Sequence, residues 1–411
     1  MLEEGPGGAR AAHEGRPLRL AVYVDAVFRC KGDRLYTYSL GFPIMCFVAE
    51  VGKHFAETRV VGRAVRAGAG TDYELPAGLR LTPLPYYEDL RRVGRVLKSI
   101  SGTLRGMWRG LSSVDAVWIF GPHPFALAFI LLALVRRRRV ILGVRQDTMS
   151  YFRARLPGRG WLPVLLPLWL VDRAFRLLAR VHPAVVVGTQ LERAYGGPRA
   201  GLMPITISLT ASSEISSEPG AKDWRGVKEL LTVGRIEPEK NPMLVVDALA
   251  ELNRRRPNEY RLTWAGVGRM MDATRRRAAA LGVERNLVFV GFVPYGPSLL
   301  AMYRSAHILV HVSLTEGLPH VLIEAMAMAT PIVATDVGSV RDAVDGGRAG
   351  VLIPAGDRDA LVDAVLRLTD DPQLRERCIE RGLIIARRHA LDVEAARVAE
   401  FIIAAAGRDR A

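Results

Sequence analysis

Short apolar runs rich in Val, Ile and Leu alternate with helical stretches along this chain, and the alternation occurs twice. The strand candidates of the first half are residues 18–24, 59–64, 116–120, 140–144 and 184–188. Those of the second half are residues 230–233, 261–265, 287–290, 308–312 and 332–334. Such runs are typical of strands buried on both faces of a parallel sheet. The pattern therefore predicts an α/β protein with two doubly wound parallel sheets.

The predicted domain organisation follows from this alternation, and 411 residues with 49% hydrophobic content are enough for two cores. Residues 1–16 are interpreted as a disordered tail without a signal peptide, because they are Gly-rich and charged. The expected units are a first domain (17–200), a connection rich in Ser, Thr, Glu and Pro (201–226), a second domain (227–389) and a C-terminal helix with a tail (390–411). Ligands of such sheets bind beyond the carboxyl ends of the strands, so the two domains should face each other across a cleft.

Two glutamates in the second half bracket a predicted anion site. Residues 315–320 read Thr-Glu-Gly-Leu-Pro-His, and Glu324 follows Glu316 by eight positions. Pro319 suits the first position of a helix, where the N–H that it lacks would be unpaired anyway. Free N–H groups and the positive end of the helix dipole would then lie between a loop carboxylate and a helix carboxylate. This arrangement fits a nucleotide-sugar, in which a diphosphate joins a sugar to a ribose.

The stretch resembles the E-x7-E signature of retaining GT-B glycosyltransferases, in particular glycosyltransferase family four. The resemblance covers about residues 227–370 well and residues 17–200 only in pattern. It implies two Rossmann-like domains, a nucleotide-sugar donor in the second domain, an acceptor in the first, and transfer with retention. It also implies that the last helix crosses back onto the first domain. The acceptor would be a glycan or a lipid-linked glycan, as in cell-surface polysaccharide or glycolipid synthesis.

The resemblance implies roles for individual donor-site residues. Glu324 would accept hydrogen bonds from ribose hydroxyls, and Glu316 would hold the transferred sugar near its reacting end. The N–H groups of Gly317 and Leu318, with Pro319 beside them, would lie near the sugar and the distal phosphate.

A cationic loop follows the first strand of the second half. Gly234, Arg235 and Lys240 match the family's G-R-x-x-x-x-K pattern. Gly234 lets the chain turn, and the two cations are predicted to stabilise the departing diphosphate, as catalytic groups alongside Glu316. In a glycoside hydrolase two carboxylates would instead act as acid and base, but that chemistry needs no phosphate site.

Other loops of the second half match in part. Gly266 and Gly268 resemble the family's G-x-G turn, whereas an NAD fingerprint would need a third Gly at Met271. Phe292 and Val293 resemble the segment that presents its backbone to the nucleotide base. The sequence departs from the family pattern at a few positions, which are Ala329, Ser339 and Asp342.

The predicted acceptor side is carried by Gly32, His123 and Arg145 in the first half. Residues 29–34 are expected to form a loop after the first strand, and relatives often have two adjacent Gly there. His123 follows the strand candidate 116–120, where it either contacts ligand or caps a helix. Arg145 and Asp147 end the next strand and should face the cleft.

No metal or cofactor is predicted beyond the nucleotide-diphosphate sugar as co-substrate. Residues 357–359 read Asp-Arg-Asp, but they precede a helical stretch and are interpreted as its cap. The three cysteines show no metal-like spacing and fit a reducing cytoplasm.

The positive charge is confined to the first half. Residues 1–200 hold 30 Lys and Arg against 15 Asp and Glu, which accounts for the whole net charge of +15. The basic stretches 88–111, 124–139 and 161–181 are also apolar, so they either lie on an anionic membrane surface or pack on the core with solvated Arg. A nucleic-acid-binding protein and an NAD(P)-dependent oxidoreductase are the alternative functions. Nucleic acid is not the expected partner, because aromatic residues make up only 7% of the chain.

Overall fold

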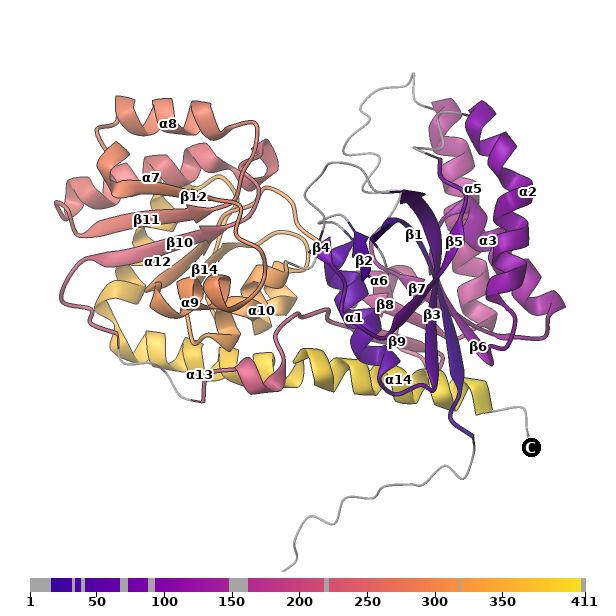
Figure 1. The fold of residues 1–411 in the computed structure, drawn as a ribbon. Coiled ribbons are helices and arrows are strands. Elements are labelled where there is room, and N and C mark those ends of the chain that lie inside the picture. Colours follow the sequence, from indigo (N-terminus) through magenta and orange to yellow (C-terminus); the bar gives the residue numbers. More distant parts are fainter. Residues whose placement is uncertain are drawn as a thin grey trace, which may run out of the picture.

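The computed structural model describes residues 16–31, 34–37, 41–66, 73–87, 93–147, 162–217, 222–317 and 319–407. It contains two α/β domains, each built on its own sheet, as expected from the alternation of strands and helices (Figure 1). The last two helices, drawn in yellow, run along one edge of the molecule from the second domain to the first.

The first sheet is mostly parallel, in the order β5-β3-β1-β6-β7-β8-β9. β2 and β4 extend it in antiparallel fashion beside the carboxyl half of β1. Its strands are β1 (Arg19–Lys31), β2 (Arg34–Thr37), β3 (Glu57–Arg66), β4 (Tyr73–Glu74), β5 (Leu79–Leu84), β6 (Ala116–Gly121), β7 (Arg139–Val144), β8 (Ala184–Val187) and β9 (Leu202–Ile205).

Helices cover both faces of the first sheet. One face packs against α1 (Phe42–Gly52) and the last helix, α14 (Leu391–Gly407). The other face packs against α2 (Val93–Gly110), α3 (Pro124–Val135), α5 (Leu162–Val181) and α6 (Thr189–Ala194). Ala395, Val398 and Ile402 of α14 share a core with strands of the first domain, so the end of the chain is part of that domain.

The second sheet is entirely parallel, in the order β12-β11-β10-β13-β14-β15. Its strands are β10 (Lys228–Val233), β11 (Tyr260–Ala265), β12 (Leu287–Gly291), β13 (Ile308–His311), β14 (Ile332–Thr335) and β15 (Val351–Ile353). Its helices are α7 (Pro242–Arg255), α8 (Met271–Ala280), α9 (Pro297–Ser305), α10 (His320–Ala327), α11 (Val340–Ala343), α12 (Arg358–Asp370) and α13 (Pro372–Arg388). Short 3-10 turns occur at Ser212–Glu214, Pro238–Lys240, Glu284–Asn286 and Asp345–Gly347.

Several boundaries predicted from the sequence were wrong. The expected loop at 29–34 is occupied by the end of β1 and the start of β2, because the first strand continues to Lys31 and pairs with Arg34–Thr37. The connection expected at 201–226 contains β9, which completes the first sheet. Pro319 is not the first residue of its helix: its backbone is extended, and α10 begins at His320.

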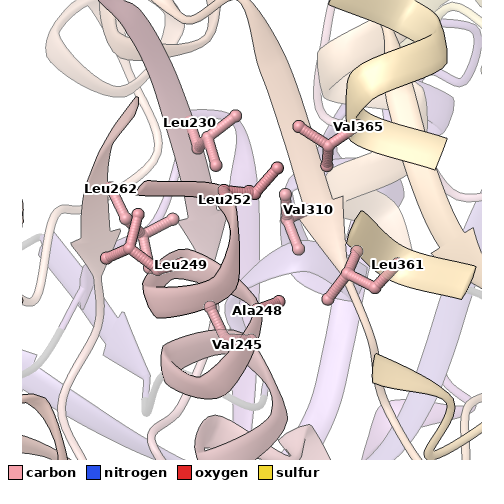
Figure 2. Close-up of a pocket in the computed structure, with 9 residues that line it drawn as sticks. All are labelled: Leu230, Val245, Ala248, Leu249, Leu252, Leu262, Val310, Leu361 and Val365. Carbon is pink, nitrogen blue, oxygen red and sulfur yellow. The ribbon is translucent and has the colours of Figure 1, made fainter. Parts of the chain in front are cut away.

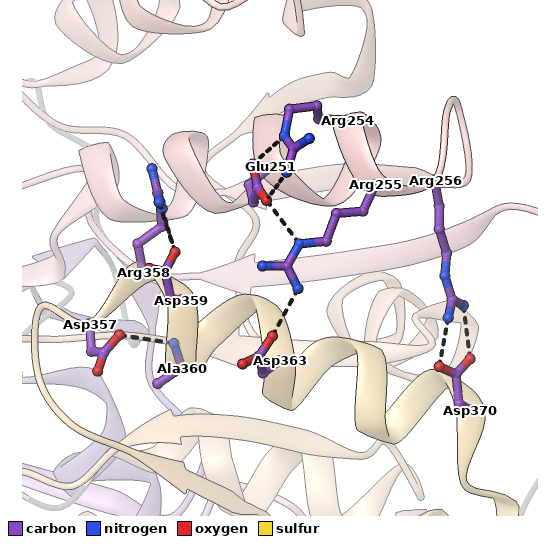
Figure 3. A network of polar contacts seen from close by, with 10 residues as sticks. All are labelled: Glu251, Arg254, Arg255, Arg256, Asp357, Arg358, Asp359, Ala360, Asp363 and Asp370. Carbon is purple, nitrogen blue, oxygen red and sulfur yellow. Dashed lines mark hydrogen bonds and ion pairs between the residues drawn. The ribbon is translucent and has the colours of Figure 1, made fainter.

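The layer formed by the two helices α7 and α12 shows how the second domain is held together. Aliphatic side chains of α7, α12 and three strands line an apolar cavity of about 10 Å³ (Figure 2). This cavity is at the lower limit for one water molecule and offers no polar partner, so it is a packing void rather than a ligand site. Around it, Arg255 and Arg256 of this layer pair with Asp363 and Asp370 of α12, and Asp357 caps α12 as predicted (Figure 3).

No helix in the described residues combines the length and the apolar content needed to cross a bilayer.

Candidate functional site

Each sheet has one point where the strand order reverses, and the polar side chains of interest gather there. In the second sheet this point lies between β10 and β13, and in the first between β1 and β6. The loops that leave two such strands diverge to opposite sides, which opens a crevice at their carboxyl ends. The loop after β10 carries Lys240, and the loop after β13 carries Glu316.

Glu316 is the centre of the polar contacts in the second domain. Its Oε1 forms an ion pair with Lys240, accepts a hydrogen bond from Ser313 Oγ at 2.6 Å, and lies 2.8 Å from Nε2 of His311. Burial by itself would raise the pKa of Glu316, but the bond from His311 and the charges of His311 and Lys240 prevail and lower it to about 2. The carboxylate is therefore ionised at any physiological pH.

The cationic loop after β10 is shaped by close backbone contacts. Gly266 has φ 155°, and a Cβ there would lie 1.9 Å from the carbonyl oxygen of Gly234. The indole of Trp264 donates to that same carbonyl at 3.0 Å. Arg235 is exposed and pairs with Glu239 at 2.7 Å, whereas Lys240 pairs with Glu316. The two predicted phosphate cations thus lie in one loop but bind different carboxylates.

The loop after β14 packs onto the backbone of the glutamate loop. A Cβ on Gly338 would lie 2.0 Å from the carbonyl oxygen of Glu316, and the N–H of Ser339 donates to the Gly317 carbonyl at 3.2 Å. Asp342 accepts a hydrogen bond from Thr189 of the first domain. Of these two departures from the family pattern, Asp342 thus contacts the first domain through its side chain, and Ser339 contacts the glutamate loop through its backbone N–H. Ala329, the third departure, adopts a left-handed φ of 54° that favours Gly.

Glu324 lies inside α10 and is 5% exposed. Tyr303 Oη donates to its Oε2 at 2.7 Å. Burial raises the pKa of Glu324 to about 7, although the bond from Tyr303 acts in the opposite direction. The two carboxylates of the motif therefore differ sharply in proton affinity, which the sequence alone does not indicate.

The remaining donor-side residues are placed as follows. Phe292 is half-exposed, and its ring centroid lies 5.7 Å from that of Tyr73 in the first domain. Val293 is partly buried in the core of the second domain. Pro319 is buried at the start of α10. Leu318 lies outside the described residues.

The first domain holds a second polar cluster at its own reversal point. Asp25 lies in a bulge of β1, within 3.0 Å of Arg63 Nε, 3.0 Å of Tyr87 Oη and 3.2 Å of His123 Nε2. His123 Nδ1 accepts the Phe125 N–H at 3.3 Å and caps α3. The neutral ring therefore carries its proton on Nε2, toward Asp25. Burial lowers the pKa of His123, and the charge of Asp25 opposes that effect.

His123 therefore caps a helix, which is one of the two roles that the sequence left open, and it also faces a polar cluster. Its contact with a ligand stays a prediction. Arg145 is exposed at the end of β7, with its guanidinium 5.9 Å from the Phe120 ring centroid. Gly32 lies outside the described residues. No three His, Cys, Asp or Glu side chains gather as a metal-binding group in the part of the chain that the structure describes.

Sequence reasoning did not select four residues of these two clusters, which are Asp25, Arg63, His311 and Ser313. Asp25 and Ser313 each follow an apolar run directly, so the rule that ligands lie beyond strand ends would have selected them. Arg63 and His311 lie within strands, and only the fold brings them to the carboxylates.

Known proteins resemble this chain mainly through its second domain. The family model described as "Glycosyl transferases group 1" matches residues 219–383. The D-inositol 3-phosphate glycosyltransferase of Frankia alni is 37% identical over 194 residues, which are 41% of this chain and 47% of that protein. The phosphatidyl-myo-inositol mannosyltransferase of Mycobacterium leprae is 33% identical over 193 residues, 46% of this chain and 49% of that protein. The chain thus spans about half the length of these curated relatives.

Solved structures match over the whole fold. The crystal structure of Anabaena HepE in complex with UDP has a TM-score of 0.67 and covers 94% of this chain and 100% of that chain, at 14% identity. A likeness at this identity shows the fold alone, which is the two-domain GT-B architecture.

Proposed function

Because residues 219–383 match the model of the glycosyl transferases group 1 family, we propose that the protein transfers a sugar from a nucleotide-diphosphate sugar to an acceptor, with retention at the anomeric carbon. The observation that carries the proposal is the pairing of Lys240 with Glu316 at the reversal point of the second sheet. It places a cation beside a permanently ionised carboxylate, next to the start of α10, where an anion is favoured.

In the proposed reaction the donor's diphosphate lies between the cationic loop and the start of α10. Arg235 and Lys240 exchange their carboxylate partners for phosphate oxygens and stabilise the charge that develops as the nucleoside diphosphate departs. Glu316, freed from Lys240, accepts hydroxyl hydrogens of the sugar, and Glu324 accepts those of the ribose. Two side-chain cations provide this stabilisation, so we propose that the reaction needs no metal ion.

The acceptor is proposed to bind in the first domain, beside Asp25 and His123. His123 presents Nε2–H to Asp25 and is held by its cap on α3, so the pair forms a fixed polar contact for an acceptor hydroxyl. The acceptor is proposed to be a glycan or a lipid-linked glycan, and the name of the mannosyltransferase relative, which refers to phosphatidyl-myo-inositol, supports a lipid-linked one. The free cysteines support a reducing, cytoplasmic setting.

The donor site is tested by binding of UDP, GDP and ADP to wild type, Arg235→Ala and the control Arg276→Ala, which removes an exposed Arg of α8. Loss of one charge-assisted hydrogen bond of about 1.5–3 kcal/mol should weaken the preferred diphosphate roughly 10- to 150-fold in Arg235→Ala. The control should bind as wild type does. Equal affinity in all three proteins would refute the site.

The chemistry is tested with a panel of nucleotide-sugars. Slow donor hydrolysis, detected by mass spectrometry, identifies the base and the sugar. The configuration of the released sugar, followed by NMR at early times, tests retention, and activity in EDTA tests metal independence. Inversion, or full loss of activity on chelation, would contradict the corresponding part of the proposal.

A further inference from the structure

Helix α3 is apolar on every side although one side faces solvent. Its sequence, PFALAFILLALV, contains no charged or hydrogen-bonding side chain. Phe129 and Ala133, among others, bury one side in the core. The opposite side presents Leu131, Leu134 and Val135, which are 64%, 43% and 71% exposed. A surface helix of a soluble domain normally carries polar residues there.

The neighbouring helices continue this exposed apolar surface. Helix α3 contacts both α5 and α2, and the three helices form one outer layer of the first domain (Figure 1). Exposed large apolar side chains lie on each of them. On α5 these are Leu166, Trp169, Leu170, Leu177 and Val181, and on α2 it is Trp108. Together with Leu131, Leu134 and Val135 they define what we call the outer helical face.

Basic side chains are interspersed with these apolar ones. Arg105 and Arg109 of α2 and Arg173 and Arg180 of α5 are exposed. Residues 136–139, directly after α3, are four consecutive arginines, and the guanidinium of Arg136 lies 3.8 Å above the Trp108 ring centroid. Within α2, α3, α5 and this arginine run the sequence has one acidic residue, Asp172, which is 4% exposed and pairs with Arg176.

We propose that the outer helical face docks the protein on an anionic lipid bilayer, with Leu and Trp side chains inserted at the level of the headgroups. Basic residues gain from the negative surface potential, and Trp beside Arg suits the boundary between headgroups and acyl chains. The contact needs no membrane-spanning helix. The inference stands apart from the proposed sugar transfer, since it rests on the composition of this face alone.

Two other occupants fit the face less well. A second copy of the chain, packed face to face about a twofold axis, would place arginine runs against each other without carboxylates to neutralise them. Nucleic acid would pair with the arginines, but exposed Leu and Val gain nothing from phosphates and form no hydrogen bonds with base edges. A lipid surface satisfies the apolar and the basic side chains at the same time.

The test is co-sedimentation of the full chain with vesicles of phosphatidylcholine alone and of phosphatidylcholine with phosphatidylglycerol at about two to one. The wild type should bind the anionic vesicles, lose binding as salt rises, and bind the neutral vesicles far more weakly. Arg173→Gln with Arg180→Gln should weaken binding about fivefold per arginine. Leu134→Gln with Val135→Gln should weaken it roughly tenfold.

Matched controls lie on the second domain. Val288→Gln with Ile384→Gln removes two apolar side chains of similar exposure, 49% and 52%, and Arg276→Gln with Arg285→Gln removes two exposed arginines. Both controls should bind vesicles as the wild type does. Thermal melting and nucleoside-diphosphate binding of all variants show that they are folded. Because the vesicle assay contains no donor, its outcome is separate from that of the transfer assay.

Three results would overturn the inference. One is equal binding of the wild type to neutral and anionic vesicles. Another is equal loss of binding in the outer-face variants and their controls. The last is a wild-type dimer in analytical ultracentrifugation that dissociates in the double variant Leu134→Gln with Val135→Gln, together with no vesicle binding by any form of the protein. That result would assign the face to a second copy of the chain.

Discussion

Replacing Glu324 by Gln should stabilise the free protein above pH 7 while it weakens nucleotide binding. Glu324 is buried in α10, where its carboxyl group contacts Tyr303 Oη. Burial raises the pKa of Glu324 from 4.5 to about 7, against the opposing effect of the Tyr303 bond. A glutamine has the same shape, carries no charge and still accepts a hydrogen bond from Tyr303.

The size and sign of the effect follow from this pKa. A rise of two to three units, at about 1.4 kcal/mol each, means that ionised Glu324 costs the folded state about 3 kcal/mol. The cost is absent below pH 4.5, because the carboxyl group is then protonated in both states. It grows as the pH rises toward 7, since the unfolded chain ionises first, and it is complete above pH 7.

The assay is thermal and urea unfolding between pH 4.5 and 8 of the wild type, Glu324→Gln and a control variant, Glu376→Gln. Glu376 is an exposed residue of α13. The Glu324 variant should match wild type near pH 4.5 and exceed it by about 3 kcal/mol at pH 8, or several degrees in Tm for a domain of this size. At pH 8 it should also bind nucleoside diphosphates more weakly. A stability difference that stays constant with pH, or a variant less stable than wild type at pH 8, would refute the reasoning.

Two further predictions concern the core and the first domain. Leu249→Ala should lower the free energy of unfolding by about 2–5 kcal/mol, because Leu249 lines the apolar void between α7 and α12 and the variant enlarges it. Urea denaturation measures this change. A loss of stability no greater than that of the surface variant Leu281→Ala would contradict the prediction. Asp25→Asn should lower the pKa of His123, since the Asp25 carboxylate 3.2 Å from Nε2 opposes the effect of burial. An NMR titration of His123 measures this directly, and an unchanged or raised pKa would count against the contact.

Much of the fold was predictable because its strands are buried on both faces. The runs near Val117, Ile141, Leu231 and Leu309 are apolar for that reason, and all lie in central strands. The strands that were missed are less apolar or shorter. β2 and β4 lie at an edge and carry Arg and Glu, and β15 is only three residues long. Such segments become strands because they form backbone hydrogen bonds with a neighbouring strand. The local sequence pattern does not indicate that such a partner is present.

The amino-acid sequence by itself determined the two α/β domains, the motif with its two glutamates, for which anion binding is predicted, and the excess of positive charge in the first half. These depend on residues that are close along the chain, where periodicity, turn chemistry and composition act. Only the tertiary structure decided that Lys240 and His311 share Glu316, that Glu324 is buried against Tyr303, and that His123 faces Asp25. Those contacts join residues from different strands and helices, and they set the proton affinities on which the proposed chemistry depends.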